Sequence, residues 1–261
     1  MKLPLYQVDA FTSRLFGGNP AAVVLLDEWL PVETMAAIAA ENNLAETAYV
    51  IPRPDVSPLR WFTPNLEIDL CGHATLATAD ILFRHTFPSL DRLTFSTQKS
   101  GNLFVTRNGE LLTLDFPAKP GKRIDVTEAM TKALGVCARE AYRARDLMLV
   151  VGSAAEVRAL TPDMRLLLAL DDFAVMVTAP GDDGVDFVSR FFAPKAGIDE
   201  DPVTGSAHCT MTPYWAERLG KTTLTAKQLS PRGGDLLCEL HGDRVLMSGR
   251  AVEYLRGEIV I

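Results

Sequence analysis

The sequence lacks the features that mark several large classes of protein. No apolar run reaches the ~20 residues that a membrane-spanning helix needs, and the N-terminus lacks the basic-then-apolar pattern of a secretory signal. Acidic residues outnumber basic ones by 33 to 26, and the formal net charge of −7 argues against a nucleic-acid-binding face. We therefore expect a globular protein that binds neither nucleic acid nor a membrane.

Cysteine is also scarce. The four cysteines have no CxxC spacing and are too few for a disulfide framework in a chain of 261 residues, which favours a reduced, cytoplasmic protein. Cys71-x-His73 and the adjacent His208-Cys209 lack the loops of about two to four residues that are common in zinc sites. Neither a Gly-x-Gly-x-x-Gly motif nor a Gly-Lys-Ser/Thr loop is present. The sequence thus predicts no metal, dinucleotide or nucleoside triphosphate.

The chain divides into two halves with a similar plan. The polar stretch "AKPGKR", residues 118–123, contains proline and glycine without periodicity and is typical of a linker. Each half combines strands with one glycine-headed helix of small and apolar residues. The predicted lobes are residues 1–118 and 119–261, with return of the final strand to the first lobe as an alternative. This is an α+β plan, in which the cleft between lobes is a usual place for a ligand.

Local patterns predict individual elements. Pro31 suits the first turn of a helix in "PVETMAAIAAENN". The run "HATLATADILFRH" after Gly72 is apolar on nearly every face, which is typical of a helix buried all round. Asn108-Gly109 predicts a β-hairpin. A single helix is expected in "AEVRALTPDMRLLLAL", residues 155–170.

Two glycine turns are the candidate binding elements. A helix start leaves backbone N–H groups unpaired and attracts anions, and a glycine there lets a ligand approach closely. Gly72-His73 and Gly205-Ser206 are two such starts, one in each half. Taken alone, each turn is better explained as a simple helix cap, because many helices begin with Gly, Ser or Thr for that reason.

Carboxylates lie close to these turns in the sequence. Asp199, Glu200 and Asp201 directly precede the second turn, where one could cap the helix or point into a cleft. Glu46 lies between a predicted helix and an apolar strand. A carboxylate at the edge of a core becomes a usable proton shuttle. Alternatively, Glu46 begins a strand at the surface, as a lone glutamate more commonly does.

Taken together, the motifs resemble one family. The segments "VDAFTSRLFGGNPAAVV", "NNLAETAYV", "RWFTPNLEIDLCGHATLATA", "RFFAP" and "IDEDPVTGSAHC" are similar, in order and spacing, to the phenazine-biosynthesis PhzF-like proteins. The resemblance implies an α+β, diaminopimelate epimerase-like fold. In this fold two pseudo-symmetric lobes each wrap a curved mixed β-sheet round a central helix, and the site lies between them. The resemblance also implies a homodimer and no metal or organic cofactor.

The resemblance also implies roles for individual residues. Glu46 falls on the catalytic acid/base of the family. His73 and Asp201 fall on residues that bind substrate and assist proton movement. The positions that match the carboxylate-binding turns are Gly72, Gly205 and Ser206. Asn19 lies in a glycine-asparagine-proline motif to which we assign a structural role.

The cysteines raise a separate question, because related epimerases use one thiol on each helix start. Cys71 occupies the first such place. Val203 stands near the second place, and valine cannot transfer a proton. Cys209 lies about one turn further along the helix, on the wrong side of the glycine. We therefore interpret Cys71 as a small buried residue.

The leading hypothesis is a cofactor-independent isomerase that moves a proton on a small unsaturated carboxylic acid, with Glu46 as general acid/base in the inter-lobe cleft. One alternative is an amino-acid epimerase or racemase. Another is a non-catalytic protein that binds small carboxylates.

Overall fold

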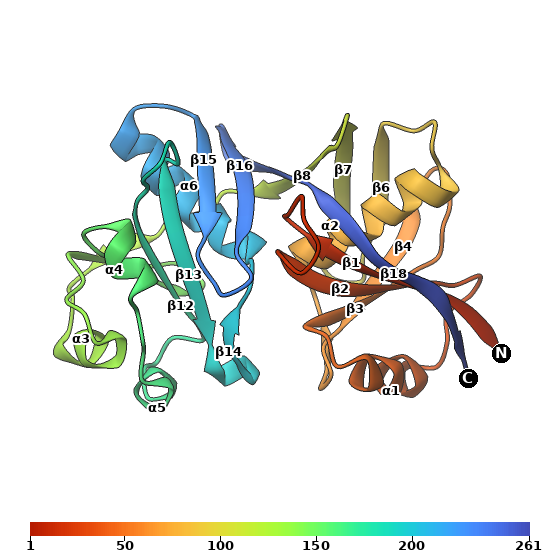
Figure 1. Cartoon of the computed structure of the whole chain (residues 1–261), viewed down its shortest axis with the longest axis horizontal. Helices are drawn as coiled ribbons and strands as arrows, with labels where there is room; N and C mark the ends of the chain where they lie inside the picture. The colour runs from red at the N-terminus through yellow and green to blue at the C-terminus, as the bar shows by residue number, and fades with distance from the viewer. The chain divides into compact units, whose positions relative to one another are not determined.

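The computed structural model describes all 261 residues, and they form two compact units. The first unit comprises residues 1–115 together with 248–261, and the second comprises residues 116–247. Figure 1 labels the elements of both. None of the helices combines the length and the apolar character that crossing a membrane requires.

The first unit is a mixed sheet with two helices. In chain order its elements are β1 (Lys2–Ala10), β2 (Asn19–Leu25), α1 (Val32–Asn42), β3 (Glu46–Val50), β4 (Ser57–Phe62), β5 (Glu67–Ile68), α2 (Gly72–Ile81), a π-helical turn (Leu82–Thr86), β6 (Arg92–Ser96), β7 (Asn102–Asn108), β8 (Leu111–Pro117) and β18 (Ala251–Val260). The strands pair in the order β18–β1–β2–β3–β4–β6–β7–β8, and β5 adds to β4.

The first and last strands of the chain are neighbours in this sheet. β1 pairs with β18 in antiparallel fashion, with Lys2 opposite Val260 and Ala10 opposite Ala251. Figure 1 shows them side by side as the red and blue strands that end at the two termini. The sheet of the first unit therefore depends on both ends of the chain.

The second unit repeats this order of elements. It contains β9 (Lys122–Ile124), α3 (Glu128–Leu134), β10 (Glu140–Arg143), β11 (Leu147–Val150), α4 (Ala154–Arg158), α5 (Met164–Leu168), β12 (Val175–Pro180), β13 (Phe187–Ala193), a 3₁₀ turn (Pro194–Ala196), β14 (Ile198–Asp201), α6 (Gly205–Leu219), β15 (Thr223–Gln228), β16 (Gly234–His241) and β17 (Arg244–Gly249). Its strands pair in the order β9–β10–β11–β12–β13–β15–β16, and β14 adds to β13.

The pairing makes α2 and α6 corresponding helices. Each follows a short strand that pairs antiparallel with the strand before it, β5 with β4 and β14 with β13. The strand after each helix then pairs in parallel with the longer strand before it: β6 with β4 after α2, and β15 with β13 after α6. A right-handed crossover through a helix is the usual way to connect parallel strands.

Several local expectations are confirmed. Every residue of α2 from His73 to Ile81 is buried, so the helix is enclosed on all sides. Pro31 occupies the N-cap position of α1, one residue before the first helical residue, Val32. The predicted hairpin joins β7 and β8, with Gly109 at a φ of 61°.

Two local expectations are corrected. The single helix expected over residues 155–170 is two short helices, α4 and α5. Pro162 has no N–H to continue the first helix, and the Asp163 carboxylate accepts from the N–H groups of Arg165 and Leu166 to cap the second. The linker expected over residues 118–123 is shorter, because β9 already begins at Lys122.

One glycine is required by close approach. Gly18 has a φ of 60°, and a Cβ there would lie 2.1 Å from the carbonyl oxygen of Ala10. Only glycine fits this position without displacing β1. The turn that it forms leads directly into Asn19, the first residue of β2.

Candidate active site

The candidate site of the first unit lies where β3 begins and α2 begins. Glu46 is the first residue of β3 and is only 9% exposed, so it starts a strand without lying at the surface. Cys71 is the extended N-cap residue of α2, and Gly72 and His73 form its first turn. His73 is 4% exposed. The fold therefore brings an acid, a thiol and an imidazole into one largely buried place.

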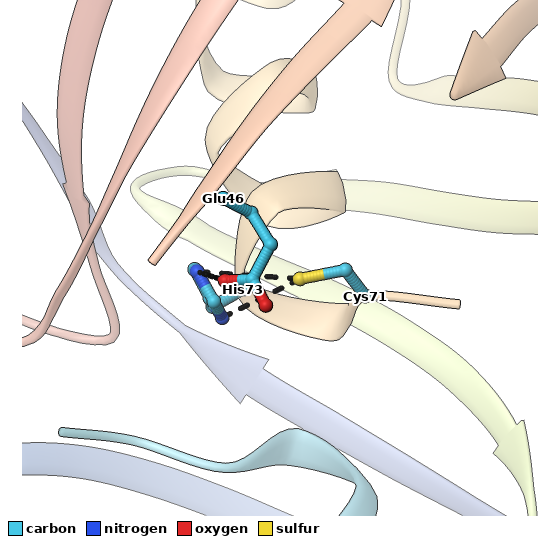
Figure 2. Close-up of side chains that lie close together, drawn as sticks. All are labelled: Glu46, Cys71 and His73. Carbon is cyan, nitrogen blue, oxygen red and sulfur yellow. Dashed lines mark hydrogen bonds and ion pairs between the residues drawn. The ribbon is translucent and has the colours of Figure 1, made fainter. Parts of the chain in front are cut away.

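These side chains contact one another (Figure 2). His73 Nε2 lies 3.0 Å from Glu46 Oε2. Cys71 Sγ lies 3.5 Å from His73 Nδ1 and 4.0 Å from Nε2. Figure 2 shows Glu46 and Cys71 converging on the His73 ring from their separate segments. The Asn19 side-chain nitrogen lies 3.1 Å from His73 Nδ1.

The electrostatics of this cluster favour a proton between the imidazole and the carboxylate. Burial lowers the pKa of His73, but the neighbouring Cys71 and Glu46 side chains raise it well above its ordinary value through charge and hydrogen bonds. Burial, followed by the charge of Glu46, raises the pKa of Cys71. The raised pKa values favour the protonated forms of the Cys71 thiol and the His73 imidazole, and the imidazole proton lies within reach of the Glu46 carboxylate, 3.0 Å away.

The candidate turn of the second unit lies between β14 and α6. The Thr204 hydroxyl does not cap α6; it donates to Asp201 Oδ2 at 2.5 Å. The Asp201 carboxylate is half-buried and is held directly before the helix start. Gly205 and Ser206 form the first turn, whose N–H groups have no carbonyl partner within the helix. Arg145 Nη2 lies 3.5 Å from the Ser206 hydroxyl.

The other two acids before this turn differ from Asp201. The Glu200 carboxylate accepts hydrogen bonds from both Nε and Nη2 of Arg190 at 2.7 Å. This bidentate pair fixes β14 against β13. Asp199 is exposed. Of the three carboxylates singled out in the sequence, only Asp201 is therefore held at the helix start.

Sequence reasoning missed Gln228, which organises this turn. Gln228 is buried at the end of β15. Its side-chain oxygen accepts from the Thr204 N–H at 2.9 Å, and its side-chain nitrogen donates to the Asp201 carbonyl at 2.7 Å. No local pattern could reveal this role, because the partners lie 24 and 27 residues away.

The structure thus gathers the predicted residues into two groups. The first unit brings together Glu46 and His73 at the Gly72 turn, and adds Cys71 and Asn19. From the sequence we assign Asn19 only a structural role. The sequence signal for its position is the neighbouring Gly18, whose close contact with β1 tolerates only glycine and which directly precedes β2.

Comparison with known proteins identifies the family. A family model, PhzC-PhzF, described as phenazine biosynthesis-like protein, matches residues 8–257. The chain belongs to this family. It is 50% identical over 260 residues to an uncharacterized isomerase of Pseudomonas aeruginosa, with 99% of each chain covered. It is 43% identical over 265 residues to one of Halalkalibacterium halodurans, with both chains fully covered. The chain is an isomerase, and these names leave its reaction unspecified.

Solved structures of similar proteins show the fold class. A PhzF-family protein from Enterococcus faecalis has a TM-score of 0.97 at 50% identity, with both chains fully covered. A hydroxyproline epimerase from Agrobacterium vitis has a TM-score of 0.62 at 11% identity, with 99% of this chain and 92% of that chain covered, a likeness of fold alone. The predicted α+β, epimerase-like fold is confirmed.

Proposed function

We propose that this PhzF-like protein is a cofactor-independent isomerase that moves a proton between carbons of a small unsaturated carboxylic acid. The observation that carries the proposal is the buried Glu46–His73 pair, in which Nε2 and Oε2 are 3.0 Å apart. A carboxylate held in this way can accept a proton from carbon and return it.

Glu46 is the proposed acid/base. In the first step the C–H bond of the substrate breaks, the proton passes to a Glu46 oxygen, and the electron pair is delocalised into the unsaturated acid. In the second step Glu46 returns the proton to a different carbon, and the double bond shifts. No oxidant or reductant is needed, because the two steps balance. His73 orients the carboxylate and shares its proton.

Substrate binding is proposed for the two helix starts. The N–H groups at Gly72 and His73, and those at Gly205 and Ser206, are suited to anionic oxygens, because helix N-termini carry partial positive charge. Asp201 would contact a neutral or cationic part of the same substrate, since two carboxylates repel one another. The proposal requires both turns to act on one molecule in the inter-lobe cleft, as the family resemblance implies.

The alternative of a two-thiol epimerase finds little support. Val203, next to the second helix start, is fully buried and cannot transfer a proton. Cys209 is buried within α6, where burial raises the pKa of its thiol to about 11 and Sγ faces the Gly205 carbonyl. A non-catalytic carboxylate-binding protein would need no Glu46–His73 pair, although it would keep the helix starts.

A screen in deuterium oxide tests the proposal. Small unsaturated carboxylic acids are incubated with the protein and scored by mass for deuterium gained at carbon. Glu46→Gln is the blank, since the amide keeps the shape but cannot transfer a proton, and the exposed Glu41→Gln is the matched control.

The expected result is exchange that Glu41→Gln retains and Glu46→Gln reduces by about 100-fold or more, with binding changed by less than about tenfold, or roughly 1.4 kcal/mol. Exchange that persists in Glu46→Gln would move the base elsewhere, with Asp201 as the next candidate. Stereospecific exchange into an amino acid would favour the epimerase. Binding without exchange at any carbon would favour the non-catalytic protein.

We also propose that the protein is a cytoplasmic homodimer, as the family resemblance implies. Light scattering of the purified chain measures its mass in solution. A mass equal to one chain at working concentrations would remove this proposal and leave the chemistry of the site unaffected.

A further inference from the structure

The Glu46–Cys71–His73 cluster has a second chemical capacity. A carboxylate oxygen, a thiol sulfur and an imidazole nitrogen lie within 4.8 Å of one another, each from a largely buried side chain. Sulfur, nitrogen and oxygen are the three ligand types that Zn²⁺ takes in proteins. We propose that this cluster is a binding site for a thiophilic divalent cation such as Zn²⁺, which inhibits the enzyme by replacing the protons of the cluster.

The geometry is close to what the ion needs. Bonds of about 2.0–2.3 Å in a tetrahedral site place ligand atoms roughly 3.2–3.7 Å apart. The Nε2–Oε2 distance is 3.0 Å and the Nε2–Sγ distance is 4.0 Å. Since all three ligand atoms already lie within 4.8 Å of one another, rotation of the Glu46 and Cys71 side chains brings them round one ion with His73. Figure 2 shows Glu46 of β3 meeting Cys71 and His73, which both lie at the start of α2.

The surroundings also fit a metal ligand. A histidine that binds zinc through one ring nitrogen usually makes a hydrogen bond through the other. The Asn19 amide nitrogen lies 3.1 Å from His73 Nδ1, opposite the nitrogen that faces Glu46; flipping this amide places its oxygen there to accept from Nδ1–H when Nε2 binds the ion. Three protein ligands leave the fourth position of a tetrahedral ion open for water or a substrate carboxylate.

Binding is an exchange of a cation for protons. The Cys71 S–H bond breaks, a Zn–S bond forms and the proton leaves to solvent; an imidazolium proton at Nε2 leaves in the same way. The site therefore holds either the protons or the ion. Inhibition rests on the proposed function, because the ion occupies the Glu46 oxygen that must take up the substrate proton. Binding itself does not rest on it.

A cobalt titration tests binding. Co²⁺ replaces Zn²⁺ as a spectroscopic probe and gives a cobalt–thiolate charge-transfer absorption only when a cysteine is a ligand. Chelator-treated protein is titrated, and Zn²⁺ is then measured by calorimetry. We expect a single site per chain. Cys71→Ser should remove the thiolate band. It should also weaken binding by more than roughly 10–100-fold, which is the usual cost of losing a residue that only hydrogen-bonds a metal ligand.

Matched variants keep this test decisive. Cys137→Ser changes an exposed thiol, the obvious place for adventitious zinc, and should leave the titration unchanged. Glu46→Gln and His73→Asn should weaken cobalt binding while keeping the thiolate band. These two variants test the site if Cys71→Ser does not fold. A band that survives Cys71→Ser, or that disappears in Cys137→Ser, overturns the site.

The inhibition is tested separately. Once a substrate is found by deuterium exchange, the rate of each variant is measured with and without Zn²⁺ and compared with its own metal-free rate. Wild-type exchange should fall as the site fills, and Cys71→Ser should need a higher Zn²⁺ concentration by the factor found in the calorimetry. Equal sensitivity of the two proteins overturns the inhibitory role, while failure to find any exchange bears only on the proposed function.

Discussion

The corresponding helices α2 and α6 begin alike and differ in what surrounds them. Each starts with glycine after an extended residue, Cys71 or Thr204. Four residues beyond that cap, each has a side chain that hydrogen-bonds the cap carbonyl: the Thr75 hydroxyl donates to the Cys71 oxygen at 2.5 Å, and His208 Nδ1 lies 2.8 Å from the Thr204 oxygen. His208 therefore corresponds to Thr75.

The counterpart of His73 in the second unit is Ser206, since both follow the glycine. The counterpart of Glu46 is apolar: Glu46 opens the parallel pairing of β3 with β2, and Val175 opens that of β12 with β11. The same scaffold thus carries a buried Glu46–His73 pair in one unit and a turn anchored by Gln228 in the other. Similar sequence letters, a His and a Cys near each turn, do not mark similar chemistry.

The pKa values of the two buried histidines are consequently shifted in opposite directions. Burial lowers the pKa of His73, but the Cys71 and Glu46 side chains raise it well above its usual value. His208 is fully buried, and its Nε2 has no hydrogen-bond partner. Burial lowers the pKa of His208 to about 4, against a smaller opposing effect of the Thr204 carbonyl. His73 is suited to hold a proton, and His208 to exclude one.

The largest expected effect comes from removing the imidazole of the first unit. His73→Gln should lower the exchange rate by about 100-fold or more, because Glu46 loses the group that orients it and shares its proton. His208→Gln should keep exchange within a few-fold of wild type. Initial rates of deuterium uptake measure both, with circular dichroism to confirm folding. Comparable losses in the two variants would erase the distinction between the histidines.

The next effect concerns stability in acid. The folded pKa of His208, about 4, is below the unfolded value of about 6.5. The unfolded chain therefore binds the proton more readily, and the stabilisation present above about pH 6.5 is lost as the pH falls towards 4. The loss attributable to His208 is about 3 kcal/mol. Urea unfolding at several pH values should show that the free energy of unfolding falls less steeply with decreasing pH in His208→Gln than in wild type. Parallel curves for the two proteins would contradict this.

A smaller effect is expected at Gln228. Gln228→Leu leaves the Thr204 N–H without its buried acceptor and the Asp201 carbonyl without its donor, which should lower the free energy of unfolding by about 1–3 kcal/mol. Substrate binding should weaken as well, because the second turn is no longer fixed. Gln98→Leu, at an exposed position of the first unit, is the matched control. An unchanged denaturation midpoint would show that this turn needs no anchor.

The smallest effect is expected at Thr204. Thr204→Val removes the hydroxyl that donates to Asp201 Oδ2 and accepts from Gln228 Nε2 at 3.2 Å, and Thr204→Ser keeps it; Gln228 Nε2 retains the Asp201 carbonyl as its partner. Because Asp201 is half-buried and water can replace the donor, the valine variant should lose only about 1 kcal/mol. Thermal unfolding of the two variants measures the difference. If the serine variant is the less stable one, the methyl group matters more than the hydrogen bond.

Local chemistry explains what the sequence could predict. The enclosed helix after Gly72 and the hairpin at Gly109 are specified by neighbouring residues, and the structure has both. The break of the expected helix at Pro162 could also have been read locally, since proline lacks the N–H and Asp163 is a good cap. Residues 155–170 are rich in helix-forming residues, but these two residues divide the segment into two helices.

The contacts of the site were less accessible to sequence reasoning. Motifs pointed to Glu46 and His73 separately, but their 3.0 Å contact depends on β3 lying beside α2. Gln228 and Thr204 meet only because β15 follows α6 back to the sheet. The thiol of Cys71 was read as packing alone, whereas its distance of 3.5 Å to the imidazole is a property of the folded turn. Such partners are fixed by tertiary pairing, which single-residue patterns do not encode.

The pairing of β1 with β18 has a consequence for how the chain folds during synthesis. Chains emerge from the ribosome N-terminus first, at about 5–20 residues per second. The second unit, residues 116–247, is continuous, and its last strand, β17, is complete once residue 249 has emerged. The first unit has most of its residues earlier, yet the edge of β1 that pairs with β18 stays open until residues 251–260 are made. The half of the protein that is translated first is thus the half that is completed last, and for some seconds it presents an unpaired strand edge to other chains.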